Sequence, residues 1–178
     1  LIESMVQGGV ILGGVNVMTM NFGGSRDAAA SMHEASVQAL LSTWQQLDGV
    51  YRRNGTPRAE AEIWRMIGAT PMIGQNDVAG DVFTLRDAQG LAAFARSVDL
   101  GRVSFWSANR DVQCGAAISD SRPSNTCSGV SQEPMEFAEA LAQGGAADDS
   151  LPAATPVNAG RADGQTRDDP RTSPYPLW

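Results

Sequence analysis

Three segments of this chain share one pattern, and their order restricts the fold more than any other feature of the sequence. Residues 15–23, 67–77 and 101–111 each begin as an apolar run of strand length and end in a cluster of polar side chains. The stretches between them have helix-period hydrophobic patterns. Alternating strands and helices predict a parallel β/α protein, with central strands that are buried on both faces. In such proteins ligand sites lie where the strands end, so we expect any functional site at the polar clusters.

Four helices are expected between and after these strands. A long helix over residues 25–53 starts with Ser25 as a capping residue and carries an apolar face. A short helix over residues 57–66 has a proline in its first turn. Residues 84–87 resemble a capping box, which predicts the start of a third helix. Residues 133–143 form the last expected helix.

The length of the chain limits the architecture. A closed eight-stranded β/α barrel typically needs about 250 residues, whereas this sequence has 178 residues and three or four β/α units. The sheet is therefore either open or part of a barrel. We expect residues 1–143 to form the ordered domain. Residues 144–178 are rich in Gly, Ala, Asp, Pro and Thr, a composition that predicts a disordered tail or linker.

Charge and hydropathy exclude several classes of partner. The chain has 13 arginines, no lysine and 20 acidic residues, giving a net charge of −7. An acidic chain without a basic stripe is a poor nucleic-acid binder. The longest apolar stretch, residues 8–20, is interrupted by glycines and Asn16 and is shorter than the roughly 20 residues of a membrane span. No charged region of a signal peptide precedes it. No phosphate-binding glycine loop is found, and we expect no cofactor.

Cys114 and Cys127 are the only cysteines and lie in a polar, loop-like stretch. A disulfide between them would close a loop of about 14 residues and stabilise the fold by roughly 3 kcal/mol. Two free thiols in a reducing compartment are the alternative. We favour the disulfide because a long polar loop gains most from a cross-link, and it would indicate an oxidising, extracellular setting. Two cysteines and the distant His33, expected to be a surface or hydrogen-bonded residue, do not make a metal site.

Residues at the strand ends are the candidates for binding a ligand. Trp106 follows the third strand, where its indole would cover a sugar ring unless it is a core residue. Met18 and Met20 share one face of the first strand. Asn21, on the opposite face, either binds a ligand or belongs to a turn before two glycines.

The polar ends of the second and third segments have two interpretations as well. Gln75, Asn76 and Asp77 suit an uncharged polyhydroxyl or acetamido ligand, although Asn76 and Asp77 also fit an Asx turn. Arg110 and Asp111 are expected to form a structural ion pair.

At these residues the chain resembles the family 18 glycoside hydrolases, specifically bacterial chitinases. Residues 15–23 resemble the sixth barrel strand of that family, residues 69–77 the seventh and residues 103–111 the eighth. The cysteine pair also matches the end of such catalytic domains, and the resemblance covers roughly residues 1–143. It implies an α/β fold, namely the C-terminal portion, about strands 6 to 8, of a (β/α)8 TIM barrel.

The resemblance implies cleavage of β-1,4-linked N-acetylglucosamine with retention, by a mechanism in which the substrate's acetamido oxygen attacks the anomeric carbon. The family's general acid is a glutamate that ends an Asp-x-x-Asp-x-Asp-x-Glu motif on the fourth strand. This sequence contains no Asp-x-Glu at all, so no catalytic residue is assigned. The resemblance carries over four substrate-contacting positions, Met18, Met20, Asn21 and Trp106. Asn21 stands where the family usually has an aspartate.

Three hypotheses follow. The first is the C-terminal portion of a secreted chitinase-like glycosidase, with chitin or an N-acetylglucosamine oligosaccharide as ligand and the N-terminal half of the barrel as a partner. The second is a non-catalytic, lectin-like chitin-binding protein, which the amide of Asn21 favours. The third is an open β/α domain that acts only in assembly.

Overall fold

The computed structural model describes residues 1–115 and 123–143, and the expected tail over residues 144–178 lies outside the described residues. The chain forms helices and strands in the following order: α1 (Ile2–Gln7), β1 (Val15–Met18), the 3₁₀ helix η1 (Gly23–Ser25), α2 (Met32–Arg53), α3 (Glu60–Met66), β2 (Ile67–Thr70), β3 (Gly74–Gln75), β4 (Val82–Phe83), α4 (Leu85–Val98), β5 (Arg102–Val103), the 3₁₀ helix η2 (Ala108–Arg110) and α5 (Glu136–Gln143).

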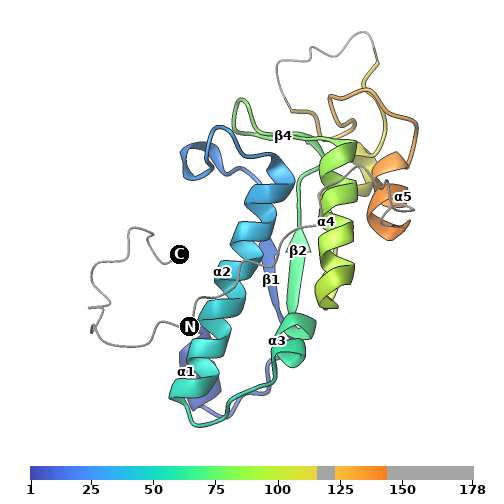
Figure 1. Cartoon of the computed structure of the whole chain (residues 1–178). Helices are drawn as coiled ribbons and strands as arrows, with labels where there is room; N and C mark the ends of the chain where they lie inside the picture. Colours follow the sequence, from blue (N-terminus) through green and yellow to red (C-terminus); the bar gives the residue numbers. More distant parts are fainter. Residues whose placement is uncertain (116–122, 144–178) are drawn as a thin grey trace. The chain divides into compact units, whose positions relative to one another are not determined.

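The three predicted strands form one parallel sheet. Its order is β1-β2-β5, with Val15 opposite Ile67 and Gly68 opposite Arg102. Helices α2 and α4 lie between successive strands in the chain, as a parallel crossover requires (Figure 1). The prediction of a parallel β/α protein is therefore confirmed.

The two faces of this sheet differ. On one face, Ile67 and Ala69 are fully buried and belong to the hydrophobic core beneath the helices. Figure 1 shows α2 and α4 side by side over β1 and β2. Side chains alternate along a strand, so Asn16, Met18 and Arg102 point to the opposite face, where they are exposed. The expected burial on both faces holds for the central strand β2, where Ile67, Gly68 and Ala69 are all buried, and not for the two strands that flank it.

A short antiparallel hairpin, absent from the sequence prediction, follows the second strand. Strand β3 pairs with β4, with Gly74 opposite Phe83 and Gln75 opposite Val82. The predicted second strand over residues 67–77 is therefore two strands, β2 and β3. The hairpin turn comprises residues 76–81 and carries the polar cluster.

Helix ends differ from the prediction where side chains cap the backbone. The capping residue of α2 is Ser31, whose side chain accepts from the N–H of Glu34 while the Glu34 carboxylate accepts from the Ser31 N–H. The expected start at Ser25 is wrong because Asp27 accepts a hydrogen bond from the N–H of Ala29, which forms a turn.

The starts of the other three helices agree with the prediction to different degrees. Helix α3 begins at Glu60, so the proline at position 57 lies before it and not in its first turn. The predicted capping box at Thr84 is confirmed. The hydroxyl of Thr84 accepts from the N–H of Asp87, and α4 begins at the next residue, Leu85. Helix α5 begins at Glu136, three residues later than predicted.

The core lies between α2, α3, α4 and the covered face of the sheet. Its fully buried side chains include Leu40, Ile63, Ile67, Phe83 and Leu91. Burial of each such side chain stabilises the fold by about 1.5–3 kcal/mol. In the part of the chain that the structure describes, no helix is long and apolar enough to cross a membrane.

Candidate functional site

Trp106 lies three residues beyond β5, and both of its backbone groups bind the segment between β2 and β3. Its backbone N–H donates to the carbonyl of Pro71 at 2.8 Å, and its carbonyl accepts from the N–H of Ile73 at 3.0 Å. The side chain is 53% exposed. Trp106 is therefore not a core residue, and a large indole surface is free for contact. The peptide bond between Trp106 and Ser107 is cis.

Met18 and Trp106 share the uncovered face. Met18 pairs with Thr70 in the sheet, and two residues further along Met72 pairs with Trp106. Paired residues lie on the same face, and residues two apart along a strand do so too. Met18 is 74% exposed, whereas Met72 is 3% exposed. Met20 is partly buried. The strand ends therefore present a thioether and an indole on the face that has no helix.

Asn21 is held by the turn of the β3-β4 hairpin. Its Oδ1 accepts from the backbone N–H of Asp77 at 2.9 Å and of Val78 at 3.3 Å. Its Nδ2 donates to Oδ2 of Asp77 at 3.2 Å, and its backbone N–H donates to Oδ1 of Asn76 at 3.0 Å. These four bonds join the end of β1 to the end of β3. The amide oxygen of Asn21 thus binds the turn of the hairpin and not a turn of its own before the two glycines, and its contact with a substrate stays a prediction.

The buried side chain of Asn76 has a structural role. Asn76 is 1% exposed and donates from Nδ2 to the carbonyls of Met72 and Gly74. A side chain with all of these partners and no exposed surface is not available to a ligand. Gln75 is partly buried and Asp77 is exposed, so Asp77 is the member of this cluster that faces solvent.

A buried ion pair fixes the next part of the same loop. Asp81 is 1% exposed; it accepts from the backbone N–H of Gly23 at 2.8 Å and from Nη2 of Arg26 at 3.1 Å. Arg26 also donates to the carbonyl of Ala30. The loop after β1 is thereby bound to the hairpin. Sequence reasoning missed this pair because Asp81 lies 55 residues after Arg26, and neither residue belongs to a recognisable motif.

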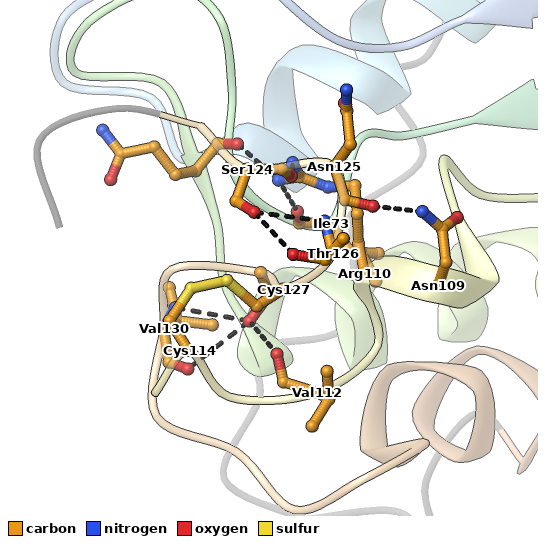
Figure 2. Close-up of a disulfide and its surroundings, with 12 residues drawn as sticks. Ile73, Asn109, Arg110, Val112, Cys114, Ser124, Asn125, Thr126, Cys127 and Val130 are labelled. Carbon is orange, nitrogen blue, oxygen red and sulfur yellow. Dashed lines mark hydrogen bonds between the residues drawn. A yellow bond between two sulfur atoms is a disulfide. The ribbon is translucent and has the colours of Figure 1, made fainter. Parts of the chain in front are cut away.

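The buried side chain of Arg110 holds the end of the second strand segment through hydrogen bonds. This side chain is fully buried and donates from Nη2 to the carbonyls of Ile73 at 2.9 Å and Gln75 at 2.7 Å, and from Nη1 to the carbonyl of Ser124. Figure 2 shows it beside Ile73 and Ser124. Burial lowers the pKa of the Arg110 guanidinium, and the charge of Asp77 opposes this shift. The group remains a cation at neutral pH.

The expected ion pair between Arg110 and Asp111 is wrong. Asp111 is 2% exposed and accepts from Nε2 of Gln132 at 2.6 Å and from the backbone N–H groups of Phe137 and Ala138. It therefore caps α5, whose first N–H groups lack partners within the helix. Adjacent residues of opposite charge suggested a pair, but each has its own buried partners.

The disulfide between Cys114 and Cys127 is present, with 5.0 Å between the two Cα atoms. Figure 2 shows it next to Val112 and Val130. Just after it, the carbonyl of Ser128 accepts from the N–H of Gln75 at 2.7 Å. The cross-link thus fastens the segment that covers the free edge of β3.

His33 and Asp87, two ionisable residues away from the strand ends, form hydrogen bonds within the fold. The Nδ1 atom of His33 lies 3.0 Å from Oγ of Ser31, so the expectation of a hydrogen-bonded histidine is confirmed. Burial opposes ionisation of Asp87, but His33 and Thr84 outweigh it through hydrogen bonds and lower its pKa. Within the described ranges no group of three or more His, Cys, Asp or Glu side chains is placed to hold a metal ion.

Comparisons with known proteins agree on one relationship, although no family model matches the chain. The probable bifunctional chitinase/lysozyme of Escherichia coli K12 is 38% identical over 117 residues, which is 62% of this chain and 13% of that protein. Endochitinase 11 of Metarhizium anisopliae is 38% identical over 110 residues, or 58% of this chain and 20% of the relative.

Solved structures extend this agreement to the fold. The catalytic domain of the hyperthermophilic chitinase from Pyrococcus furiosus superposes with a TM-score of 0.67 and 31% identity. Site mutants of active domain 2 of the thermostable chitinase from the same organism, complexed with chito-oligosaccharides, superpose with the same values. In both cases the match covers 80% of this chain and 43% of the solved chain. This chain is therefore homologous to chitinases and matches part of a chitinase catalytic domain.

Proposed function

We propose that this chain forms the sugar-binding end of three neighbouring strands in a chitinase-type glycoside hydrolase. One observation carries the proposal. At the carboxyl edge of a parallel sheet, Trp106 is 53% exposed although its backbone N–H and carbonyl are both hydrogen-bonded. This edge is where parallel β/α proteins bind ligands. The homology to chitinases favours a glycosidase over a β/α domain that acts only in assembly.

Each proposed contact has a physical role. Trp106 provides an apolar surface beneath the sugar ring, and covering a third of its ~150–250 Å² would contribute ~1–2 kcal/mol. Met18 and Met20 line the same surface with polarizable thioethers. Asn21 contributes a polar group from the end of β1, on the other side of β2. The ligand is chitin or an N-acetylglucosamine oligosaccharide.

The proposed reaction is hydrolysis with retention. The acetamido oxygen of the substrate attacks the anomeric carbon, an acid gives its proton to the leaving oxygen, and water then opens the cyclic intermediate. The acid would come from an Asp-x-x-Asp-x-Asp-x-Glu segment, which is not among these 178 residues. This chain therefore contributes binding and not proton transfer, and the N-terminal half of a barrel is its proposed partner. The disulfide supports secretion as its setting.

A lectin-like protein is the second candidate, and position 21 favours it. An amide stands there, and its oxygen already accepts two backbone hydrogen bonds. Hydrolysis of an N-acetylglucosamine tetramer by the protein that contains this segment and the rest of the barrel separates the two candidates, because a lectin binds the tetramer without cleaving it.

Binding by the chain itself tests the proposed site. Isothermal titration with an N-acetylglucosamine tetramer compares the unmodified chain with Trp106→Ala, which we expect to lose ~1–3 kcal/mol of binding free energy from the area that an indole covers. Met135→Ala is the matched control, because Met135 is 49% exposed and lies outside the strand ends. Equal affinities of the unmodified chain and Trp106→Ala would contradict the proposal.

A further inference from the structure

Arg102 places a cation at the amino end of the uncovered sheet face. Its side chain lies across Gly68 of the neighbouring strand, where a Cβ would meet Cγ of Arg102 and Oδ1 of Asn16. The guanidinium reaches the loop before β1: Nη2 donates to the carbonyl of Gly13 at 3.2 Å and lies 2.7 Å from the position that a Cβ would take at Gly14. Two positions without side chains therefore give this arginine room to lie along the sheet, although it is exposed.

Arg102 forms no ion pair within residues 1–115 and 123–143, whereas Arg65, at the same end of the sheet, pairs with Asp99 at 2.7 Å. The bond to Gly13 uses one of the five N–H groups of a guanidinium. The polar neighbours on the face bind each other, since Nδ2 of Asn16 donates to Oγ1 of Thr70 at 2.6 Å. The other N–H groups of Arg102 are therefore left to solvent in the described part of the chain.

Covering this face changes the energetic position of Arg102. In the proposed function the remaining strands of a barrel complete the sheet, and the uncovered face becomes an interior surface. A guanidinium stays protonated there. Removing an unpaired charge from water is strongly unfavourable, so interior charges are paired and hydrogen-bonded. Whatever covers Arg102 therefore has to bring an anion, and a carboxylate fits the planar fork of N–H groups in two parallel bonds.

A second copy of this chain does not meet that requirement. A two-fold pair in which the free edge of β1 of one copy joins the free edge of β5 of the other would turn both uncovered faces toward one interior. The two Arg102 side chains would then share this interior and repel each other. The charge of the face thus favours an acidic occupant over a second copy.

We propose that the amino end of the uncovered face is the docking surface for the N-terminal half of the barrel, which carries a carboxylate that forms an interior ion pair with Arg102. This inference rests on the proposed function and gives the chemistry of the partner that the function requires. It divides the uncovered face into two parts. The carboxyl edge beside Trp106 is the surface for the sugar, and the amino end with Arg102 joins the two parts of the barrel.

Arg102→Met tests the ion pair in the protein that contains this segment and the rest of the barrel. Methionine keeps an apolar stem but leaves the partner carboxylate buried without its cation. We expect the melting temperature at pH 7 to fall by on the order of 10 °C. This deficit should shrink between pH 7 and pH 5, because a buried, unpaired carboxylate binds a proton more tightly in the folded state than in the unfolded state. Arg52→Met is the matched control, because Arg52 is 63% exposed and pairs with Asp48 on α2.

Two results would overturn the inference: a melting temperature of Arg102→Met that equals or exceeds that of the unmodified protein at pH 7, or a deficit that stays constant with pH and so reflects lost packing alone. If Arg102→Met does not fold at pH 7, recovery of folded protein at pH 5 supports the ion pair, and failure to recover contradicts it. Loss of tetramer binding in Trp106→Ala together with a constant deficit would leave the proposed function standing while this inference fails.

Sedimentation equilibrium of the 178-residue chain tests the alternative occupant. We expect the chain not to dimerise through the uncovered face. A dimer that Met18→Arg disrupts would show that a second copy covers this face, since Met18 lies on it and is 74% exposed, and would overturn the assignment of an acidic partner.

Discussion

The two faces of the β1-β2-β5 sheet use the same strands for different purposes. Ile67 and Ala69 are fully buried beneath the helices, whereas Met18 and Trp106, on alternate positions of the same sheet, are 74% and 53% exposed. Large apolar side chains left in water gain nothing for the stability of the described fold. The covered face therefore holds the domain together, and the carboxyl edge of the uncovered face is the surface that we propose for a ligand.

The largest expected effect is a difference in unfolding free energy between substitutions on the covered face and on the uncovered face. Ile67→Ala removes a fully buried side chain and should lower the free energy of unfolding by about 2–5 kcal/mol. Met18→Ala should change it by less than about 0.5 kcal/mol, because its side chain is exposed. Urea unfolding followed by far-ultraviolet circular dichroism measures both. A loss in Met18→Ala as large as that in Ile67→Ala would show that the second face is covered too.

The disulfide stabilises the segment beside the carboxyl edge of the sheet, which the helices do not cover. Replacing both Cys114 and Cys127 by alanine should reduce the free energy of unfolding by about 3 kcal/mol, since the cross-link closes a loop with a sequence separation of 13. The N–H of Gln75, bound to Ser128, should then exchange faster with deuterium. Thiol counting under denaturing, non-reducing conditions is the control. Two free thiols in the unmodified chain would remove the basis of this prediction.

Low pH should reduce the free energy of unfolding through Asp87 on the covered side. Its carboxylate accepts from the N–H of His33 at 3.0 Å and from the N–H of Thr84, which joins the starts of α2 and α4. Its pKa is lower in the folded chain than in the unfolded chain. The folded state therefore gains stability above the unfolded value, and this gain is lost as the pH falls through the folded value. Unfolding free energies between pH 7 and pH 2 should fall less steeply in Asp87→Asn. Identical slopes in the two proteins would exclude this contribution.

Local patterns in the sequence predicted the parallel sheet and the position of Trp106 at a strand end. They succeeded because strand-length apolar runs and capping residues act over a few positions. The sequence did not predict the β3-β4 hairpin because its conformation depends on contacts with a segment far away in the chain. Gly74 has a φ of +68°, and a Cβ there would lie 2.0 Å from the carbonyl oxygen of Ser128. Only the packed segment 54 residues later shows why a glycine is needed.

The polar part of the site was predicted less well for the same reason. Arg110 and Asp111 are neighbours in sequence, yet their partners are Gln75 and Gln132, which no local pattern connects to them. Asn21 and Asp77 were each identified as strand-end residues. Their hydrogen bond forms because two loops distant in sequence meet, which no local pattern predicts.

The central claim is that a sugar binds at the uncovered carboxyl edge beside Trp106, and the indole N–H signals of the tryptophans test it directly. Heteronuclear NMR of the ¹⁵N-labelled chain, titrated with an N-acetylglucosamine tetramer, compares Trp106 with Trp44 and Trp64, which stack at 6.1 Å among the helices. The variant Trp106→Phe assigns the first signal. We predict that the Trp106 signal shifts with ligand concentration while the signals of Trp44 and Trp64 stay in place. A stationary Trp106 signal, or a shift confined to the other two, would contradict the account.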